Sequence, residues 1–143
     1  MFSPQTNEIK RNAMKELLQK ESIKKILVVD DEEIISNLFK VGLEMFGYEV
    51  VVASNANEGL KCFKENPADL IITDMFMPKK NGHTFILEIL DEFPETKFFV
   101  ISGDVLFAPE MKLNIEKNLG SIKVFTKPIK IGELIPAIKE LSA

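Results

Sequence analysis

Short apolar runs and helical patterns alternate five times along this chain, and no other feature restricts its fold as much. Alternation of this kind predicts a doubly wound (βα)5 architecture, a five-stranded parallel sheet with right-handed crossovers and helices on both faces. An α/β fold of this size needs one hydrophobic core, and 143 residues suffice for it. The predicted strands are Lys25–Val29, Tyr48–Ala53, Asp69–Thr73, Lys97–Ile101 and Ile122–Thr126.

Each predicted strand is followed by a helical pattern. The first of these helices has a broad apolar face and stops near Gly47; that face contains Ile34, Ile35, Leu38, Phe39, Val41, Leu43, Met45 and Phe46. The other helices are expected at Glu58–Glu65, His83–Glu92, Pro109–Asn118 and Ile131–Leu141. Pro136 lies inside the last of them and should kink it, unless that helix starts later.

Residues 1–22 form an N-terminal extension to a domain at residues 23–143. From Glu8 the extension has helical spacing, with Ile9, Ala13 and Leu17 on one side. It holds four basic and three acidic residues, a net charge of +1, which leaves −5 for the rest of a chain whose total is −4. The extension is either an amphipathic helix packed on its own domain or a docking or dimerisation helix.

Net charge, apolar runs and cysteine content exclude some classes of function and of cellular location for this chain. A net charge of −4 argues against direct nucleic acid binding as the main activity. No apolar run approaches the ~18 residues of a membrane span, and the N-terminus has no apolar signal-peptide core. Cys62 is the only cysteine, so an intrachain disulfide is impossible. We therefore expect a cytoplasmic protein with no membrane segment.

Polar side chains stand where four of the five strands end. Asp30 and Asp31 follow the first strand, Asp74 the third, Ser102 the fourth and Lys127 the fifth. Because parallel strands end along one edge, these side chains are predicted to converge. Clustered carboxylates raise one another's pKa, and a divalent cation relieves the repulsion; oxygen-only ligands suit Mg²⁺.

This set suits a phosphoryl acceptor. With Mg²⁺ held by the carboxylates, Asp74 would act as a nucleophile and form an acyl phosphate. Lys127 would pair with one phosphoryl oxygen, and Ser102 would donate a hydrogen bond to another. Each residue also has an ordinary interpretation. The Asp30–Asp31 pair could cap the next helix, Asp74 and Ser102 could belong to turns, and Lys127 could be a surface lysine.

The chain resembles, over residues 24 to about 141, the receiver domain of bacterial two-component response regulators (the CheY-like family). The resemblance rests on residues 26–32 (ILVVDDE), residues 69–78 (DLIITDMFMP) with Asn81-Gly82, Ser102-Gly103 and Lys127-Pro128.

The resemblance implies a flavodoxin-like sheet of order 2-1-3-4-5, for which the family is a standard example. It also implies phosphotransfer to Asp74 from a sensor histidine kinase or histidine phosphotransfer protein, with the backbone carbonyl of Phe76 as a further Mg²⁺ ligand. Such a domain catalyses only its own phosphorylation and dephosphorylation. It signals to a downstream protein through the face formed by the helix expected at Pro109–Asn118, the strand Ile122–Thr126 and the helix Ile131–Leu141, with homodimerisation as a further option.

Two positions depart from the family's usual pattern. Val124 stands where an aromatic residue is usual, and Phe125, one place later, should point to the opposite face of the sheet. Phe76 is bulky and apolar where smaller or polar residues help position water, so we expect slow autodephosphorylation; Asp104 would offset this. His83, the only histidine, is expected at the surface.

Other functions stay open at this point. A degenerate receiver could serve as a phosphorylation-independent interaction platform, although the intact polar set argues against it. A flavodoxin-like nucleotide or flavin binder would need a phosphate-binding loop after the first strand, where four acidic residues stand. A metal-dependent hydrolase with an aspartyl intermediate would want a general acid near position 76, which is phenylalanine.

Overall fold

The computed structural model describes residues 7–12, 14, 22–77, 80–103 and 122–142. The predicted helix Pro109–Asn118, Pro78 and Asp104 lie outside these residues. The domain elements are β1 (Lys25–Val29), α2 (Glu33–Met45), β2 (Glu49–Ala53), α3 (Ala56–Glu65), β3 (Leu70–Asp74), α4 (Gly82–Glu92), β4 (Lys97–Ser102), β5 (Ile122–Thr126) and α6 (Ile131–Ser142).

The five strands form one parallel sheet in the order β2-β1-β3-β4-β5. This confirms the predicted fold class and strand order. The register places Val29 of β1 beside Thr73 of β3, and Asp74 beside Ile101 of β4. The residues that follow β1 and end β3 therefore stand at the same level of the sheet.

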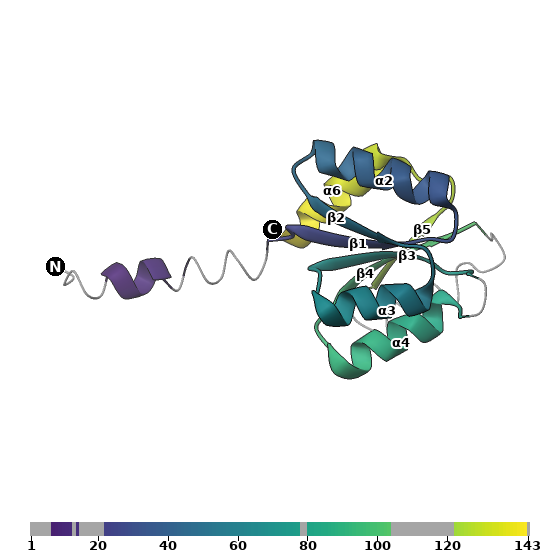
Figure 1. The fold of residues 1–143 in the computed structure, drawn as a ribbon. Coiled ribbons are helices and arrows are strands. Elements are labelled where there is room, and N and C mark those ends of the chain that lie inside the picture. The colour runs from purple at the N-terminus through teal and green to yellow at the C-terminus, as the bar shows by residue number, and fades with distance from the viewer. Residues whose placement is uncertain (1–6, 13, 15–21, 78–79, 104–121, 143) are drawn as a thin grey trace.

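Helices cover both faces of the sheet, with α2 and α6 on one side and α3 and α4 on the other (Figure 1). Alternate strand residues enter two separate cores, as expected for strands buried on both faces. In β4, Phe98 and Val100 pack toward α3 and α4, and Phe99 and Ile101 pack toward α2 and α6. All four are 2% exposed or less, so β4 is held firmly from both sides.

Helix α2 does not use all of its apolar residues for the core. Only Phe39 and Leu43 of the predicted apolar face are buried, together with Ser36, and Ile35 packs at the edge of the core. The expected single broad face is therefore wrong: α2 is apolar on two opposite sides. Five of the eight predicted residues are exposed, namely Ile34, Leu38, Val41, Met45 and Phe46.

Side-chain caps explain why two helices begin earlier than predicted. Asn55 accepts a hydrogen bond from the backbone N–H of Glu58, so α3 begins at Ala56, two residues before the predicted start. Asn81 accepts from the N–H of Thr84 in the same way, and α4 begins at Gly82.

Helix α6 begins at Ile131, so Pro136 does lie inside it and the alternative of a later start is wrong. Within the described ranges, no helix combines the length and the apolar character that crossing a membrane requires.

Gly47 supplies the first stability prediction. It adopts φ 91° after α2, with its N–H bonded to the carbonyl of Glu44 at 3.0 Å. A Cβ at position 47 would contact no other atom, but residues with a Cβ rarely adopt a positive φ. Gly47→Ala should therefore lower the free energy of unfolding by about 1–2 kcal/mol. The matched control is Gly132→Ala, because that Cβ also meets nothing and position 132 is helical without a positive φ. Urea unfolding of both variants checks this, and equal losses would contradict it.

Candidate functional site at the carboxyl edge of the sheet

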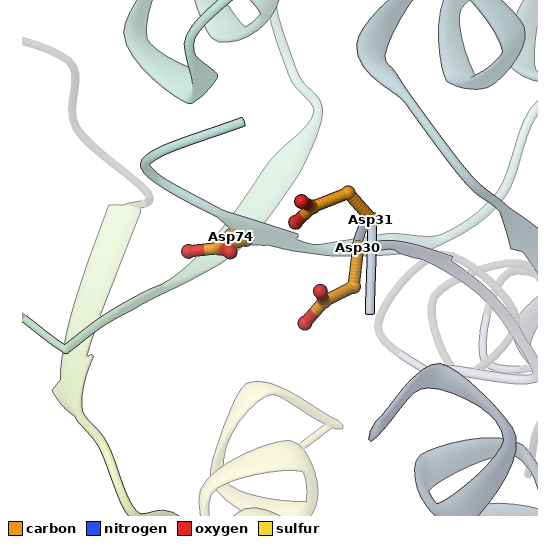
Figure 2. Close-up of side chains that lie close together, drawn as sticks. All are labelled: Asp30, Asp31 and Asp74. Atoms are coloured by element: carbon orange, nitrogen blue, oxygen red, sulfur yellow. The ribbon is translucent and has the colours of Figure 1, made fainter. Parts of the chain in front are cut away.

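Three carboxylates gather where β1 and β3 end. Asp30 and Asp31 follow β1 directly, and Asp74 is the last residue of β3. One carboxylate oxygen from each lies within 4.8 Å of the others, and Figure 2 shows Asp30 and Asp31 extending toward Asp74. Asp30 and Asp74 are only 3% and 5% exposed, whereas Asp31 is exposed. The predicted convergence of these acids is thus present in the fold.

Hydrogen bonds to the backbone hold the two buried acids. Oδ1 of Asp30 accepts from the N–H of Glu32 at 2.8 Å, and Oδ1 of Asp74 accepts from the N–H of Phe76 at 3.4 Å. The residue at the N-cap of α2 is Glu32, and no side chain caps that end. Asp30 and Asp31 therefore do not cap the helix, and the first of the ordinary interpretations fails.

Lys127 brings a positive charge to the cluster. Its Nζ lies 3.3 Å from Oδ2 of Asp74 and 3.6 Å from Oε1 of Glu32. Its backbone N–H donates to the carbonyl of Ser102 at 2.8 Å, which ties the start of the β5–α6 loop to the end of β4. The sequence analysis assigned Glu32 no role in the site. Its position directly after the acid pair Asp30-Asp31 is the signal from which a role for Glu32 in the site could have been predicted.

The charges shift one another's ionisation. Burial raises the pKa of Asp30 to about 6, and the negative charge of Asp74 adds to the rise. Burial likewise raises the pKa of Asp74, while the nearby Lys127 opposes that change. Burial alone would lower the pKa of Lys127, but the charges of Asp74 and Asp30 outweigh it and hold that pKa above its usual value. Ionisation of Asp30 and Asp74 is therefore less favourable in the folded protein than in water.

These residues fit a hard divalent cation. The three ligand groups are all oxygens, two are buried, and their mutual repulsion is what a cation would relieve. A cavity of about 470 Å³ adjoins them, so water or a phosphate can share the site. The cavity is lined by Asp31, Glu32, Asp74, Phe76, Gly103 and Lys127. Mg²⁺, which keeps several non-protein ligands, matches this arrangement.

Close packing positions the loop after Asp74. The N–H of Gly82 donates to the carbonyl of Met75 at 2.7 Å, and a Cβ at Gly82 would lie 2.5 Å from the carbonyl oxygen of Asp74. Only glycine permits this approach, because the obstacle is backbone. Gly82 therefore packs the start of α4 closely against the loop that follows Asp74.

The remaining predicted residues lie where strand geometry puts them. Ser102 ends β4, 3% exposed, and Phe76 is 51% exposed beside the cavity. Val124 packs into the core on the α3–α4 side, and Phe125 packs on the α2–α6 side, its ring 5.0 Å from that of Phe99. This confirms that positions 124 and 125 face opposite sides. His83 is exposed on α4, as expected.

Comparison with known proteins decides the family. Residues 26–139 match the model of the response regulator receiver domain. The chain belongs to this family. It is 34% identical over 119 residues, 82% of its length, to the alkaline phosphatase synthesis transcriptional regulatory protein PhoP of Bacillus subtilis. The chain spans about half (48%) of the length of PhoP.

Solved receiver domains share the fold. A response regulator receiver domain protein from Clostridium thermocellum is 35% identical, with a TM-score of 0.75 over 84% of this chain and 94% of that one. The response regulator TrrA of Thermotoga maritima, solved in complex with Mg²⁺-BeF, is 31% identical, with a TM-score of 0.72 over 83% and 99%. The predicted family is thus confirmed.

The raised pKa of Asp30 predicts an unusual pH dependence of stability. Its ordinary value is 3.8, so between about pH 4 and 6 the folded receiver domain keeps a proton that the unfolded chain has released. In EDTA, the free energy of unfolding should therefore fall as pH rises through this window, by at most about 3 kcal/mol. Asp74 contributes with the same sign.

Urea unfolding at a series of pH values measures this slope, and Asp30→Asn should reduce it. An Asp30→Asn variant with the same slope as the unsubstituted protein across this window would contradict the raised pKa of Asp30.

Proposed function

We propose that Asp74 accepts a phosphoryl group from a phosphohistidine, in a Mg²⁺-dependent reaction that switches a protein-interaction surface. We assign this function to residues 23–143, with residues 1–22 as an extension. The observation that carries the proposal is the buried Asp74 carboxylate, which has two further carboxylates within 4.8 Å and the Lys127 ammonium 3.3 Å away. This combination serves both to hold a cation and to bind a phosphoryl group.

The metal would be held by the carboxylates of Asp30, Asp31 and Asp74, with the backbone carbonyl of Phe76 as a further ligand. Bound there, Mg²⁺ would neutralise the repulsion between a carboxylate nucleophile and a phosphoryl dianion. The TrrA structure holds Mg²⁺-BeF in a domain of the same family, which supports the choice of cation.

In the transfer step, a carboxylate oxygen of Asp74 forms a bond to phosphorus as the bond from phosphorus to the donor imidazole nitrogen breaks. The electron pair of the broken bond stays on the imidazole. The product is an acyl phosphate on Asp74. Lys127 would pair with a phosphoryl oxygen, and the 3.3 Å distance from its Nζ to Oδ2 of Asp74 supports this role. The partner would be a sensor histidine kinase or histidine phosphotransfer protein.

The switch would run through Ser102 and Lys127. Ser102 would donate a hydrogen bond to the phosphoryl group, and the backbone of the two residues is already joined by the 2.8 Å hydrogen bond from Lys127. Both begin loops that leave the sheet edge, so a shift there would change the surface near β5 and α6. With Val124 in place of an aromatic residue, no aromatic side chain at that position would take part. The intact polar set gives the degenerate alternative no support.

Phosphorylation can be tested with a small donor. With Mg²⁺ and acetyl phosphate, the intact mass should increase by one phosphoryl group, because Asp74 needs no partner protein to react. Asp74→Asn should abolish the addition, whereas Asp91→Asn, an exposed aspartate on α4, should leave it unchanged. EDTA should also prevent it. Addition that survives in Asp74→Asn would refute Asp74 as the acceptor, and none in the unsubstituted chain would favour the degenerate platform.

Phe76 predicts a long-lived phosphorylated form. Its ring stands 51% exposed at the cavity that a hydrolytic water would have to enter. Phe76→Asn should accelerate loss of the phosphoryl group several-fold, because a smaller amide leaves room for that water and can orient it. Decay is followed by intact mass after the donor is removed. Leu87→Asn, which replaces a 45% exposed leucine on α4, is the matched control. An unchanged rate in Phe76→Asn would count against the idea.

A further inference from the structure

Helix α2 carries an apolar stripe on the side that faces away from the sheet. The stripe consists of Ile34, Leu38, Val41 and Met45, which are 83%, 59%, 61% and 80% exposed. Their spacings of four, three and four residues place them in one row along the helix. Phe39 and Leu43, which enter the core, lie on the opposite side. We call this row the α2 stripe.

A row of this kind differs from scattered surface residues. Single exposed apolar side chains are ordinary, but contiguous ones mark surfaces that something covers. A helix that packs one face on a sheet normally has a polar outer face. The α2 stripe runs the length of the helix, from the end beside Asp31 to the end beside β2. The α2 stripe is therefore a candidate surface for an apolar contact with a helix.

The chain itself contains a segment of this character. Residues 7–12 are helical, and the helical spacing of the sequence continues to about residue 18. Ile9 and Met14 are 68% and 58% exposed, so this segment also has apolar side chains that are exposed to solvent. Its apolar positions in the sequence are Ile9, Ala13, Met14, Leu17 and Leu18.

The attachment point of the segment suits the α2 stripe. The carbonyl of Lys24 accepts from the N–H of Glu49, and Tyr48 donates to the carbonyl of Leu43, so the chain enters β1 beside the C-terminal end of α2. The steps from residue 18 to residue 23 span up to about 17 Å. A helix over residues 8–18 would be about 15 Å long, and the stripe covers about 16 Å. The segment would thus run parallel to α2, with its first residues at the site end.

Charge favours the same placement. The segment has a net charge of +1 and the remaining chain −5. In the parallel arrangement, Lys10 and Arg11 come to the end of α2 where Glu33 and the acidic cluster stand. Attraction there would orient the segment, and apolar contact with the stripe would hold it.

We propose that the N-terminal segment of the same chain covers the α2 stripe, with Met14 beside Val41 and Ile9 between Ile34 and Leu38. The contact itself requires no phosphorylation, so it is tested without a phosphodonor.

The test is a disulfide cross-link in the 143-residue chain, in a Cys62→Ser background because Cys62 is the only cysteine of this sequence. Met14→Cys is paired with Val41→Cys. The control pairs Met14→Cys with Leu87→Cys, a similarly exposed position on α4, across the sheet from α2. Under mild oxidation of dilute protein, most of the first pair should form an intramolecular disulfide, several-fold more than the control. Ile9→Asp should reduce that yield by weakening the apolar contact.

Three outcomes would overturn the proposal. Equal yields in the two pairs would mean that the segment has no preferred face. A disulfide-linked dimer from the first pair would make the occupant the segment of a second copy. A low yield in both that pair and a second pair, Ile9→Cys with Leu38→Cys, would leave the stripe to a partner protein. None of these outcomes bears on phosphorylation of Asp74.

Discussion

Repulsion among three carboxylates at one edge of the sheet is the constraint on which the rest of this structure depends. Two of them are buried, so the protein holds negative charge where water stabilises it less than at an exposed surface. Lys127 offsets part of that cost, and it can do so because it contacts Asp74 directly. On the proposed function, the negative charge that remains would give the site its affinity for a cation and for a phosphoryl group that arrives with one.

The sheet creates this arrangement through its register. Val29 pairs with Thr73, so Asp30 and Asp74 come next on neighbouring strands at the same level. Ser102 lies beside Thr126 one step further along, and Lys127 lies beyond it. A lysine side chain is long enough to reach back to Asp74, where a shorter cation would not. Burial of β1 and β3 on both faces fixes this register, because a slip of one residue would exchange the two cores.

Strand periodicity and strand-end chemistry were enough to predict a five-stranded parallel sheet and the charged cluster, since both follow from local pattern plus parallel pairing. The order of the strands came from the family resemblance. They also placed Val124 and Phe125 on opposite faces. The surface of α2 was not predictable in this way. Its apolar residues occur on two sides of the helix, and periodicity cannot tell which side meets the sheet. Glu32 was missed because its contact with Lys127 spans 95 residues of sequence.

That contact links the site to the helices around it. Lys127 stands between Asp74 at 3.3 Å and Glu32 at 3.6 Å. A phosphoryl group on Asp74 would add negative charge, and Glu32 is the weaker competitor because it is 60% exposed and hydrated. Lys127 would then leave Glu32 for the phosphoryl group. Since Glu32 begins α2 and Lys127 leads into α6, one exchange of ion-pair partner would reach both helices on the same face of the sheet.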